Sequence, residues 1–263
     1  MEKQLAIIIP AHNEEKRIEK TLRKYLSYFN NIEKSKNLNY KIIVVINASK
    51  DKTKDIVEEM RKKDKHLEYL DLAKGGKGYA VIEGFKEAIK NDFNLIGFVD
   101  ADMATSPSSF NDLILNINKN DGVLASRYVS GSRLIPAMTF RRVVVSRVFN
   151  FLVRSLFLIP YRDTQCGAKL FTARALKNSV YSIGMTQWAF DMELLYTMHK
   201  NNMKIIEIPT VWTDVADSKL RVGKTSVQMF FSVLQLRVIK SPLRKLLHPL
   251  KPIVMLLWGL LNK

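Results

Sequence analysis

Short apolar runs alternate along the chain with longer stretches in which apolar residues recur at helical spacing. Uninterrupted apolar runs are typical of buried strands, and the periodic stretches are typical of amphipathic helices. In the first 100 residues this pattern predicts strands at 4–10, 41–46, 66–72 and 95–100, with a helix in each interval. The first of these helices carries its apolar residues at Ile18, Leu22, Tyr25, Leu26 and Phe29. Strands that alternate with helices favour a mostly parallel sheet covered by helices on both faces.

The second half of the chain departs from this alternation. Two further strands are predicted, at 122–126 and 204–209, and a long helix at 141–160 lies between them in sequence. The polar residues of that helix fall on one narrow stripe made of Ser146, Arg147, Asn150 and Arg154. A second apolar helix is predicted at 227–240. We therefore expect an α/β domain over residues 1–225 and a basic amphipathic segment over residues 226–263.

Composition narrows the possible partners and the redox setting. The chain has 263 residues, is 47% hydrophobic and carries a net charge of +17. That charge indicates an anionic partner, which can be a nucleic acid, a phosphate-bearing substrate or an anionic membrane surface. The single cysteine, Cys166, excludes disulfides within the chain and a cysteine-rich metal site. No stretch reaches the roughly 20 apolar residues of a membrane-spanning helix, and the short apolar run near the N-terminus does not resemble a signal peptide.

Two acidic residues follow the strand at 95–100 directly. Asp100 and Asp102 stand one residue apart, and two like charges so close raise the pKa of one of them. A divalent cation relieves the repulsion, and carboxylate oxygens suit Mg²⁺ or Mn²⁺ that also binds the phosphates of a substrate. The alternative is an ordinary solvated loop with two acids.

A turn rich in glycine and lysine precedes the helix that contains Ala80. It reads KGGKGYAV over Lys74–Val81. Backbone N–H groups at a helix N-terminus favour anions, and a lysine adds a point charge. The turn is consistent with a phosphate site or, taken alone, with a basic surface turn.

These segments, in this order and spacing, resemble the inverting glycosyltransferases of the GT-A type. The resemblance is carried first by IIIPAHNEE, VVINASKDKT, GKGYAV and VDADMA. Further motifs narrow it to the dolichyl-phosphate glucosyltransferases, with the dolichyl-phosphate mannose synthases as close relatives: SRY, RRVVVS, RDTQCGAKLF, WAFDMELL and SKL. The resemblance covers roughly residues 4–225 and implies a Rossmann-like GT-A fold.

The resemblance implies a donor site for a nucleotide diphosphate sugar, with Mg²⁺ or Mn²⁺ held by Asp100 and Asp102. The implied donor residues are Pro10, His12, Asn13, Glu14, Asn47, Ser49, Lys77, Gly78, Asp100, Ala101, Asp102 and Lys219. Lys77 and Lys219 would neutralise the donor phosphates. Two departures leave the base open: His12 replaces a family tyrosine, and residues 46–49 read Ile-Asn-Ala-Ser where the family has Asp-Asp-Gly-Ser.

The implied acceptor is a polyprenyl phosphate such as dolichyl phosphate. Its phosphate is already anionic at neutral pH, so a strong general base is dispensable, and arginines suit phosphate binding. The implied acceptor residues are Arg127, Arg141, Arg142, Ser146, Asn150, Asp163 and Gln165. The catalytic group comprises Asp100, Asp102, Arg127, Arg142 and Asp191, where Asp191 holds the sugar or the acceptor loop or, alternatively, acts as a base. Cys166 is expected to be a packed residue.

The sequence thus predicts transfer of a hexose, glucose from UDP-glucose, to a polyprenyl phosphate with inversion. Because the lipid head lies at the bilayer surface, we expect a peripheral enzyme on the cytoplasmic face of a membrane, attached through residues 143–159 and 242–263. The alternatives for these segments are a core helix and a packing or oligomer-forming tail. The alternatives for function are a GDP-mannose or UDP-N-acetylhexosamine donor, a non-lipid acceptor, or a non-catalytic basic protein that binds membrane or nucleic acid. No nucleic-acid-binding signature is present, and the oligomeric state is left open.

Overall fold

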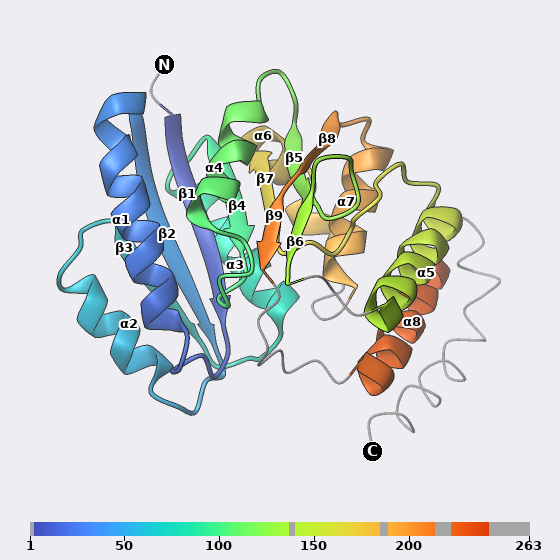
Figure 1. The fold of residues 1–263 in the computed structure, drawn as a ribbon, viewed down its shortest axis with the longest axis horizontal. Helices are drawn as coiled ribbons and strands as arrows, with labels where there is room; N and C mark the ends of the chain where they lie inside the picture. Colours follow the sequence, from blue (N-terminus) through green and yellow to red (C-terminus); the bar gives the residue numbers. More distant parts are fainter. Residues whose placement is uncertain (1–2, 137–139, 185–188, 214–221, 242–263) are drawn as a thin grey trace.

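The protein is built around one seven-stranded sheet (Figure 1). The computed structural model describes residues 3–136, 140–184, 189–213 and 222–241, except for the side chains of residues 34–36, 140–142 and 222–228. The strand order is β3-β2-β1-β4-β7-β5-β8. The strands are β1 (Lys3–Ala11), β2 (Leu38–Asn47), β3 (Leu67–Leu72), β4 (Leu95–Val99), β5 (Gly122–Ser126), β7 (Ala168–Thr172) and β8 (Ile205–Pro209).

The sheet is mostly parallel, as the alternation of strands and helices predicts. β1 pairs in parallel with β2 and β4, β2 with β3, and β5 with β8. β7 is the exception, because it lies antiparallel to both β4 and β5. The carboxyl ends of β1, β2, β4 and β5 therefore share one edge of the sheet, and the start of β7 joins them there.

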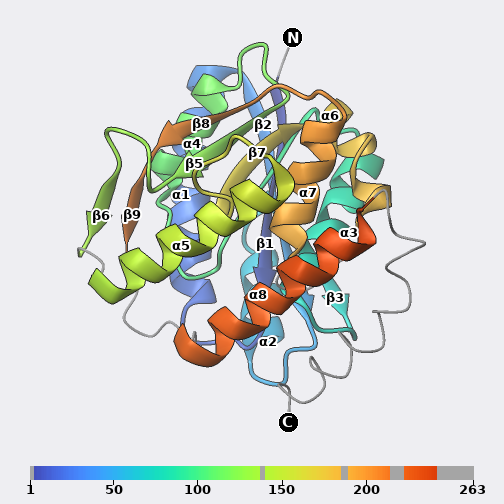
Figure 2. The same ribbon diagram turned by 90° about the vertical axis from the view of Figure 1, so that its right-hand side faces the viewer.

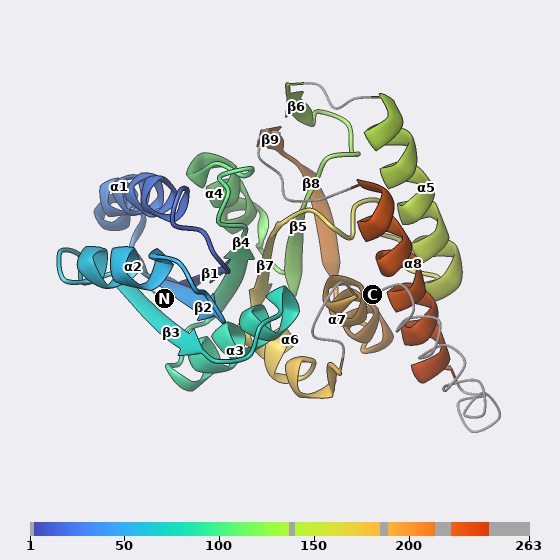
Figure 3. The same ribbon diagram turned by 90° about the horizontal axis from the view of Figure 1, so that it is seen from below.

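Helices cover both faces of the sheet (Figure 3). One face carries α1 (Ile18–Lys36), α2 (Thr53–Arg61) and α4 (Pro107–Asn116), and the other carries α3 (Lys77–Lys90), α6 (Ala173–Lys177) and α7 (Phe190–Lys200), with a short 3₁₀ turn at Val180–Ser182. The five apolar residues of α1 that the sequence pattern selects are all buried. Helical periodicity therefore places α1 with the correct face against the sheet.

Two further helices lie side by side (Figure 2), beyond β8 in the view of Figure 3. They are α5 (Phe140–Phe157) and α8 (Val222–Ile239), and Val233 and Leu236 of α8 are buried in the core. Residue 225 falls inside α8, so the expected boundary does not coincide with an end of this helix, and the division of the chain stays a prediction. A small parallel sheet of β6 (Arg133–Ile135) and β9 (Val211–Thr213) completes the fold. None of the helices in the described part of the chain has the length and apolar character needed to cross a membrane.

Only part of the polar stripe expected on α5 is exposed to solvent. Asn150 is buried, whereas Arg147 and Arg154 are exposed. Several large apolar side chains on this helix are also exposed, as is Leu158, the residue that follows it. Those on the helix are Val144, Val145, Val148 and Phe151. Exposed apolar side chains next to arginines make this surface unlike an ordinary helix packed into a core.

Candidate active site

The loops after three neighbouring strands each contain a residue with left-handed backbone, within four positions of the strand end. Asn13, Ala48 and Met103 follow β1, β2 and β4, and their φ angles are 55°, 48° and 63°. Left-handed backbone is uncommon for residues other than glycine and clusters at functional sites. Ala48 occupies the place of the glycine in the family pattern, which explains why that pattern has a glycine there. The edge is therefore a strained, specifically shaped region, and Asp100 and Asp102 lie on it.

The acidic doublet is held by backbone contacts. The Asp100 backbone N–H donates to the Gly167 carbonyl at 3.2 Å, and Oδ1 of Asp102 accepts from the Ala104 N–H at 2.9 Å. Burial raises the pKa of Asp102, and the neighbouring charge of Asp100 raises it further. Tyr25 of α1 is affected in the same way, because burial and then the charges of Asp100 and Asp102 raise its pKa. The doublet is thus a concentration of negative charge that a cation would relieve.

Lys77, the first residue of α3, reaches this doublet. Its Nζ lies 2.5 Å from Oδ1 of Asp100. Burial acts to lower the pKa of Lys77, but the charges of Asp100 and Asp191 outweigh it and raise the pKa. The turn before the helix requires Gly76, whose φ of 131° is disfavoured for other residues. The glycine-and-lysine turn therefore places an ammonium group beside the carboxylates, as its sequence predicts.

Asn47 ties this turn to the ends of β1 and β2. Its Nδ2 donates to the Ala11 carbonyl at 3.1 Å, and its Oδ1 accepts from the Gly76 N–H at 3.1 Å. His12 follows β1 and contacts the Asn47 carbonyl through Nδ1 at 2.7 Å. The Asn47 amide is thus engaged by the backbone on both sides, whereas the side chain of His12 is exposed at the same edge.

The other expected donor residues lie at the same edge with mixed roles. The Ser49 Oγ accepts from the Asn13 N–H at 3.1 Å. Glu14 is paired with Arg17 at 2.6 Å. Pro10, Gly78 and Ala101 are buried and contribute backbone rather than side-chain chemistry: they lie in β1, in the first turn of α3 and in the loop after β4.

Directly after β5, at the same edge of the sheet, Arg127 forms a buried ion pair with Asp163. The Arg127 Nε donates to Oδ2 of Asp163 at 2.8 Å, and Nη2 donates to Oδ1 at 2.9 Å. Burial opposes the charge on Asp163, but the guanidinium of Arg127 holds the pKa of this carboxyl below its ordinary value. Arginine carries more N–H groups than these two bonds use, so Asp163 orients the guanidinium without exhausting its donors.

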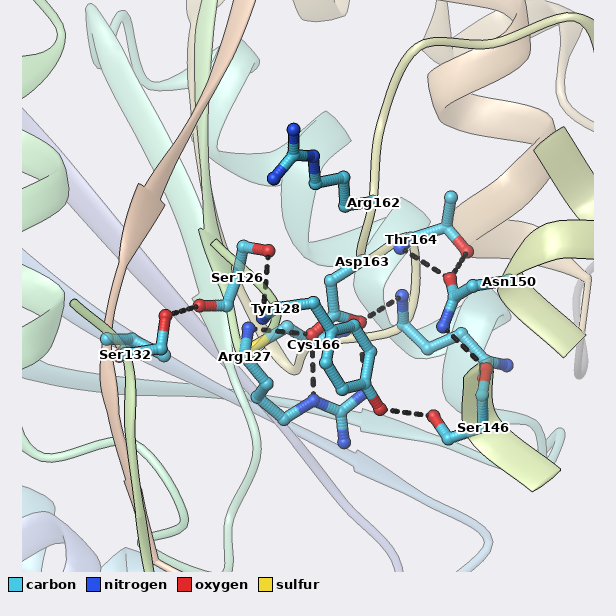
Figure 4. Close-up of polar contacts among 12 residues, drawn as sticks. Ser126, Arg127, Tyr128, Ser132, Ser146, Asn150, Arg162, Asp163, Thr164 and Cys166 are labelled. Atoms are coloured by element: carbon cyan, nitrogen blue, oxygen red, sulfur yellow. Dashed lines mark hydrogen bonds and ion pairs between the residues drawn. The ribbon is translucent and has the colours of Figure 1, made fainter. Parts of the chain in front are cut away.

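Helix α5 joins this group through Ser146 and Asn150 (Figure 4). The Ser146 hydroxyl is hydrogen-bonded to the Tyr128 hydroxyl. Oδ1 of Asn150 accepts from both the N–H and the hydroxyl of Thr164, each at 3.2 Å. Three separate segments therefore meet here: the end of β5, helix α5 and the loop that precedes β7.

The loop before β7 connects the two halves of the site. Asp163 pairs with Arg127, and Gly167, four positions later in the sequence, lies against Asp100. Between them the Gln165 and Cys166 N–H groups bond to Oδ1 of Asp163, at 3.3 and 3.1 Å. Cys166 is fully buried, and burial followed by the charge of Asp163 raises its pKa to about 12. A buried, protonated thiol agrees with the expected packing role.

Asp191 lies in the first turn of α7 and is paired with a buried lysine. Its Oδ1 accepts from Lys169 Nζ at 2.7 Å. Reasoning from the sequence did not select Lys169 or Gly167, although both stand in the RDTQCGAKLF motif. The available signal was a lysine within an otherwise apolar strand.

Three of the expected residues have side chains outside the described part of the chain. Lys219 lies outside the described residues, and the backbone of Arg141 and Arg142 belongs to α5 while their side chains lie outside the description. For those three residues the expected roles stay predictions.

The residues present fit a divalent cation. Asp100 and Asp102 supply hard oxygen ligands, and the Asp100 carboxylate already pairs with the ammonium group of Lys77. Within the described ranges no three His, Cys, Asp or Glu side chains come together as a metal site. Two carboxylates completed by substrate phosphates and water are an arrangement that Mg²⁺ commonly uses.

Solved structures share this architecture. Glucosyl-3-phosphoglycerate synthase from Mycobacterium tuberculosis, solved with Mn²⁺, UDP and phosphoglyceric acid, matches with a TM-score of 0.66 and 16% identity, over 91% of this chain and 80% of that one. At this identity the likeness concerns the fold alone, and it confirms the expected GT-A architecture.

Sequence comparison identifies the family. Dolichyl-phosphate beta-glucosyltransferase from Dictyostelium discoideum is 33% identical over 89% of this chain and 73% of its own length. The Homo sapiens protein of the same name is 33% identical over 90% of this chain and 75% of its own length. The model of glycosyl transferase family 2 matches residues 6–179. The chain therefore belongs to glycosyl transferase family 2, in agreement with the resemblance drawn from its motifs.

Proposed function

We propose that the protein transfers glucose from UDP-glucose to the phosphate of dolichol or a related polyprenol, with inversion at the anomeric carbon. Its relatives named dolichyl-phosphate beta-glucosyltransferase support the donor sugar and the acceptor. The observation that carries the proposal is the loop 163–167, which touches Arg127 at one end and Asp100 at the other. One short segment thus joins a phosphate-binding arginine to the acidic doublet.

The donor lies at the doublet in this proposal. Asp100 and Asp102 hold Mg²⁺ or Mn²⁺, which when bound would offset the negative charge of the diphosphate. Lys77 adds a second cation at the N-terminus of α3, where backbone N–H groups also face the phosphates. His12, Asn13 and Ser49 line the side toward the base. The Mycobacterium tuberculosis enzyme of the same fold was solved with Mn²⁺ and UDP, which supports a nucleoside diphosphate and a divalent metal as ligands of this protein.

The acceptor phosphate lies between β5 and α5. We assign its binding to Arg127 and Ser146, and to Arg141 and Arg142 at the start of the same helix. Asn150, which is buried and bonded to Thr164 and to the Ser146 carbonyl, supports this group from behind. An oxygen of the acceptor phosphate attacks the anomeric carbon, and the bond from that carbon to the leaving phosphate oxygen breaks with its electron pair remaining on UDP. The attacking oxygen carries no proton, so no residue has to remove one. Gln165 and Asp191 then serve to order the loop and the hexose.

The outer surface of α5 gives the lipid a place to approach. Val148 and Phe151 are exposed beside Arg147 and Arg154. Apolar side chains that enter the interface and cations that meet anionic lipid heads are the features of a helix that lies on a membrane. We assign residues 1–225 to catalysis and residues 226–263, with α5, to attachment at the cytoplasmic face.

A panel of donors and acceptors tests the proposal. The full chain is incubated with UDP-glucose, GDP-mannose or UDP-N-acetylglucosamine as donor. Each donor is combined with dolichyl phosphate, undecaprenyl phosphate or 3-phosphoglycerate as acceptor, and the products are identified and quantified by mass spectrometry. The proposal predicts a hexose added to a polyprenyl phosphate from UDP-glucose at a rate at least tenfold above the other donors. Faster transfer from another donor, or to 3-phosphoglycerate, would contradict it.

A further inference from the structure

Lys169 is a fully buried lysine in the middle of a central strand. Its side chain has no exposed surface, and β7 places it directly beside Phe98 of β4 and Leu124 of β5. Every other buried residue of β7 is apolar. Burying an ammonium group is unfavourable unless it is paired and hydrogen-bonded. A lysine retained here calls for a specific partner.

The partner is Asp191. Lys169 Nζ donates to Oδ1 of Asp191 at 2.7 Å and to the Cys166 carbonyl at 2.6 Å. The ammonium also lies over the ring of Phe98, 5.1 Å from its centroid. These contacts hold Lys169 from three directions, so the position of its charge is fixed by the sheet and by the loop that precedes β7.

A second lysine approaches the same part of the sheet edge. Asp191 is bonded to Lys169, and the ammonium group of Lys169 lies over a Phe98 ring that Lys77 also approaches. Lys77 Nζ is 5.9 Å from the same Phe98 ring and 2.5 Å from Asp100. Asp191 is therefore on the side of the sheet edge where the donor diphosphate and its sugar would lie. One carboxylate oxygen is committed to Lys169, and the carboxylate is oriented by that bond.

We infer that Lys169 is a positioning residue that holds Asp191 as an ionised hydrogen-bond acceptor for the hydroxyl groups of the transferred hexose. This inference rests on the proposed function. It also gives Asp191 a role that needs no proton transfer. The hexose is recognised through a carboxylate whose orientation is set from beneath by a buried cation, rather than by a freely rotating side chain.

The inference separates recognition of the sugar from recognition of the nucleotide. The full-length chain with Mn²⁺ is titrated calorimetrically with UDP-glucose and with UDP, for the natural protein and for Lys169→Met. We expect Lys169→Met to weaken UDP-glucose binding about tenfold and to leave UDP binding within about twofold, because UDP lacks the hexose. A variant that merely disturbed the fold would weaken both ligands alike.

Glu193→Gln is the matched control. Glu193 is buried two positions further along α7, and it pairs with Lys240 at 2.8 Å. The substitution breaks the ion pair of another buried carboxylate on the same helix without touching Asp191, so the ratio of the two affinities should stay within about twofold of the natural value. The same sugar-selective loss in Glu193→Gln would overturn the inference.

A double variant keeps the test decisive if Lys169→Met does not fold. Asp191→Asn is compared with Asp191→Asn/Lys169→Met, which leaves no unpaired buried charge. If Lys169 acts through Asp191, the two differ by less than about twofold in the ratio of UDP-glucose to UDP affinity, and a further loss in the double variant would overturn the inference. A natural protein that binds neither UDP nor UDP-glucose would refute the proposed function itself, whereas binding with an unchanged ratio in Lys169→Met would refute only the role of Lys169.

Discussion

Gly167 lies so close to the Asp100 carboxylate that no side chain fits between them. A β-carbon at residue 167 would overlap Oδ2 of Asp100, well inside van der Waals contact. The same glycine accepts the Asp100 N–H through its carbonyl. Residue 167 therefore fixes both the backbone and the carboxylate of the first acid of the doublet, although 67 positions separate the two residues in the sequence.

Gly167→Ala is expected to displace the Asp100 carboxylate and to weaken the metal-bound donor. We predict a loss of transfer of at least about 100-fold, as is usual when a group that stabilises developing charge is misplaced. Mn²⁺ affinity, measured by electron paramagnetic resonance with UDP present, should fall with it. Gly184→Ala is the control, since a β-carbon there meets nothing within 4 Å. Equal activity in the two variants would show that Asp100 need not occupy this position.

Asp163→Asn should destabilise the protein, because Arg127 would lose the charge that compensates it. Breaking a buried pair in this way costs about 3 kcal/mol, to be measured by urea denaturation at pH 7. The pKa of Asp163 is lowered in the folded state, so its contribution is fully present above the ordinary aspartate pKa and is lost as the pH falls through the lowered value. The difference between natural protein and variant should therefore shrink only in strongly acidic solution.

The exposed Asp92 provides the comparison for that variant. Its left-handed φ of 57° suits asparagine, so Asp92→Asn should change the free energy of unfolding by less than about 0.5 kcal/mol. A stability loss that grows as the pH falls would contradict the sign of the Asp163 shift.

Cys166 should be chemically silent. With its pKa raised from 9.0 to about 12, the thiolate fraction at pH 8 falls about a thousandfold, and burial blocks reagents as well. We expect iodoacetamide to label Cys166 only after unfolding, as followed by mass spectrometry. Cys166→Ala should retain transfer within about twofold. Rapid labelling of the folded protein, or abolished transfer by a folded alanine variant, would argue for a reactive thiol.

The exposed face of α5 should bind membranes. Phe151, with 68% of its surface exposed, would carry a charge into the lipid interface as Phe151→Glu. Co-sedimentation with vesicles of phosphatidylcholine and phosphatidylserine should weaken about tenfold, while UDP binding is unchanged. Leu115→Glu changes a 51% exposed residue on α4, across the sheet, and should leave vesicle binding as it is. Equal weakening by both variants would count against α5 as the docking face.

Hydrophobic patterning was sufficient to predict the elements that are either continuously apolar or apolar along one regular face. β1 and β2 are long apolar runs and α1 has a regular apolar face, so each is evident from its own residues. β7 is not, because Lys169 interrupts a short strand whose burial depends on neighbours far away in the sequence. β6 and β9, with three residues each, are too short for a period to show.

The site was predictable to a similar extent. Asp100, Asp102 and Lys77 follow strand ends or precede a helix, and parallel strands bring such positions to one edge, so their proximity follows from the chain. The contacts of Gly167 with Asp100 and of Lys169 with Asp191 depend on β7 entering the sheet antiparallel between β4 and β5. Strand order of that kind is a property of the whole fold, and no local pattern encodes it.

The central claim is that the acidic doublet holds the metal-bound diphosphate while an acceptor phosphate attacks the anomeric carbon beside it. Transfer of glucose by the variant Asp102→Ala tests this claim most directly. The lipid product formed from UDP-glucose and dolichyl phosphate with Mn²⁺ is quantified by mass spectrometry, and circular dichroism checks the fold. The account predicts glucosylated lipid from the natural protein and none above background from the folded variant. Undiminished product from Asp102→Ala would contradict it.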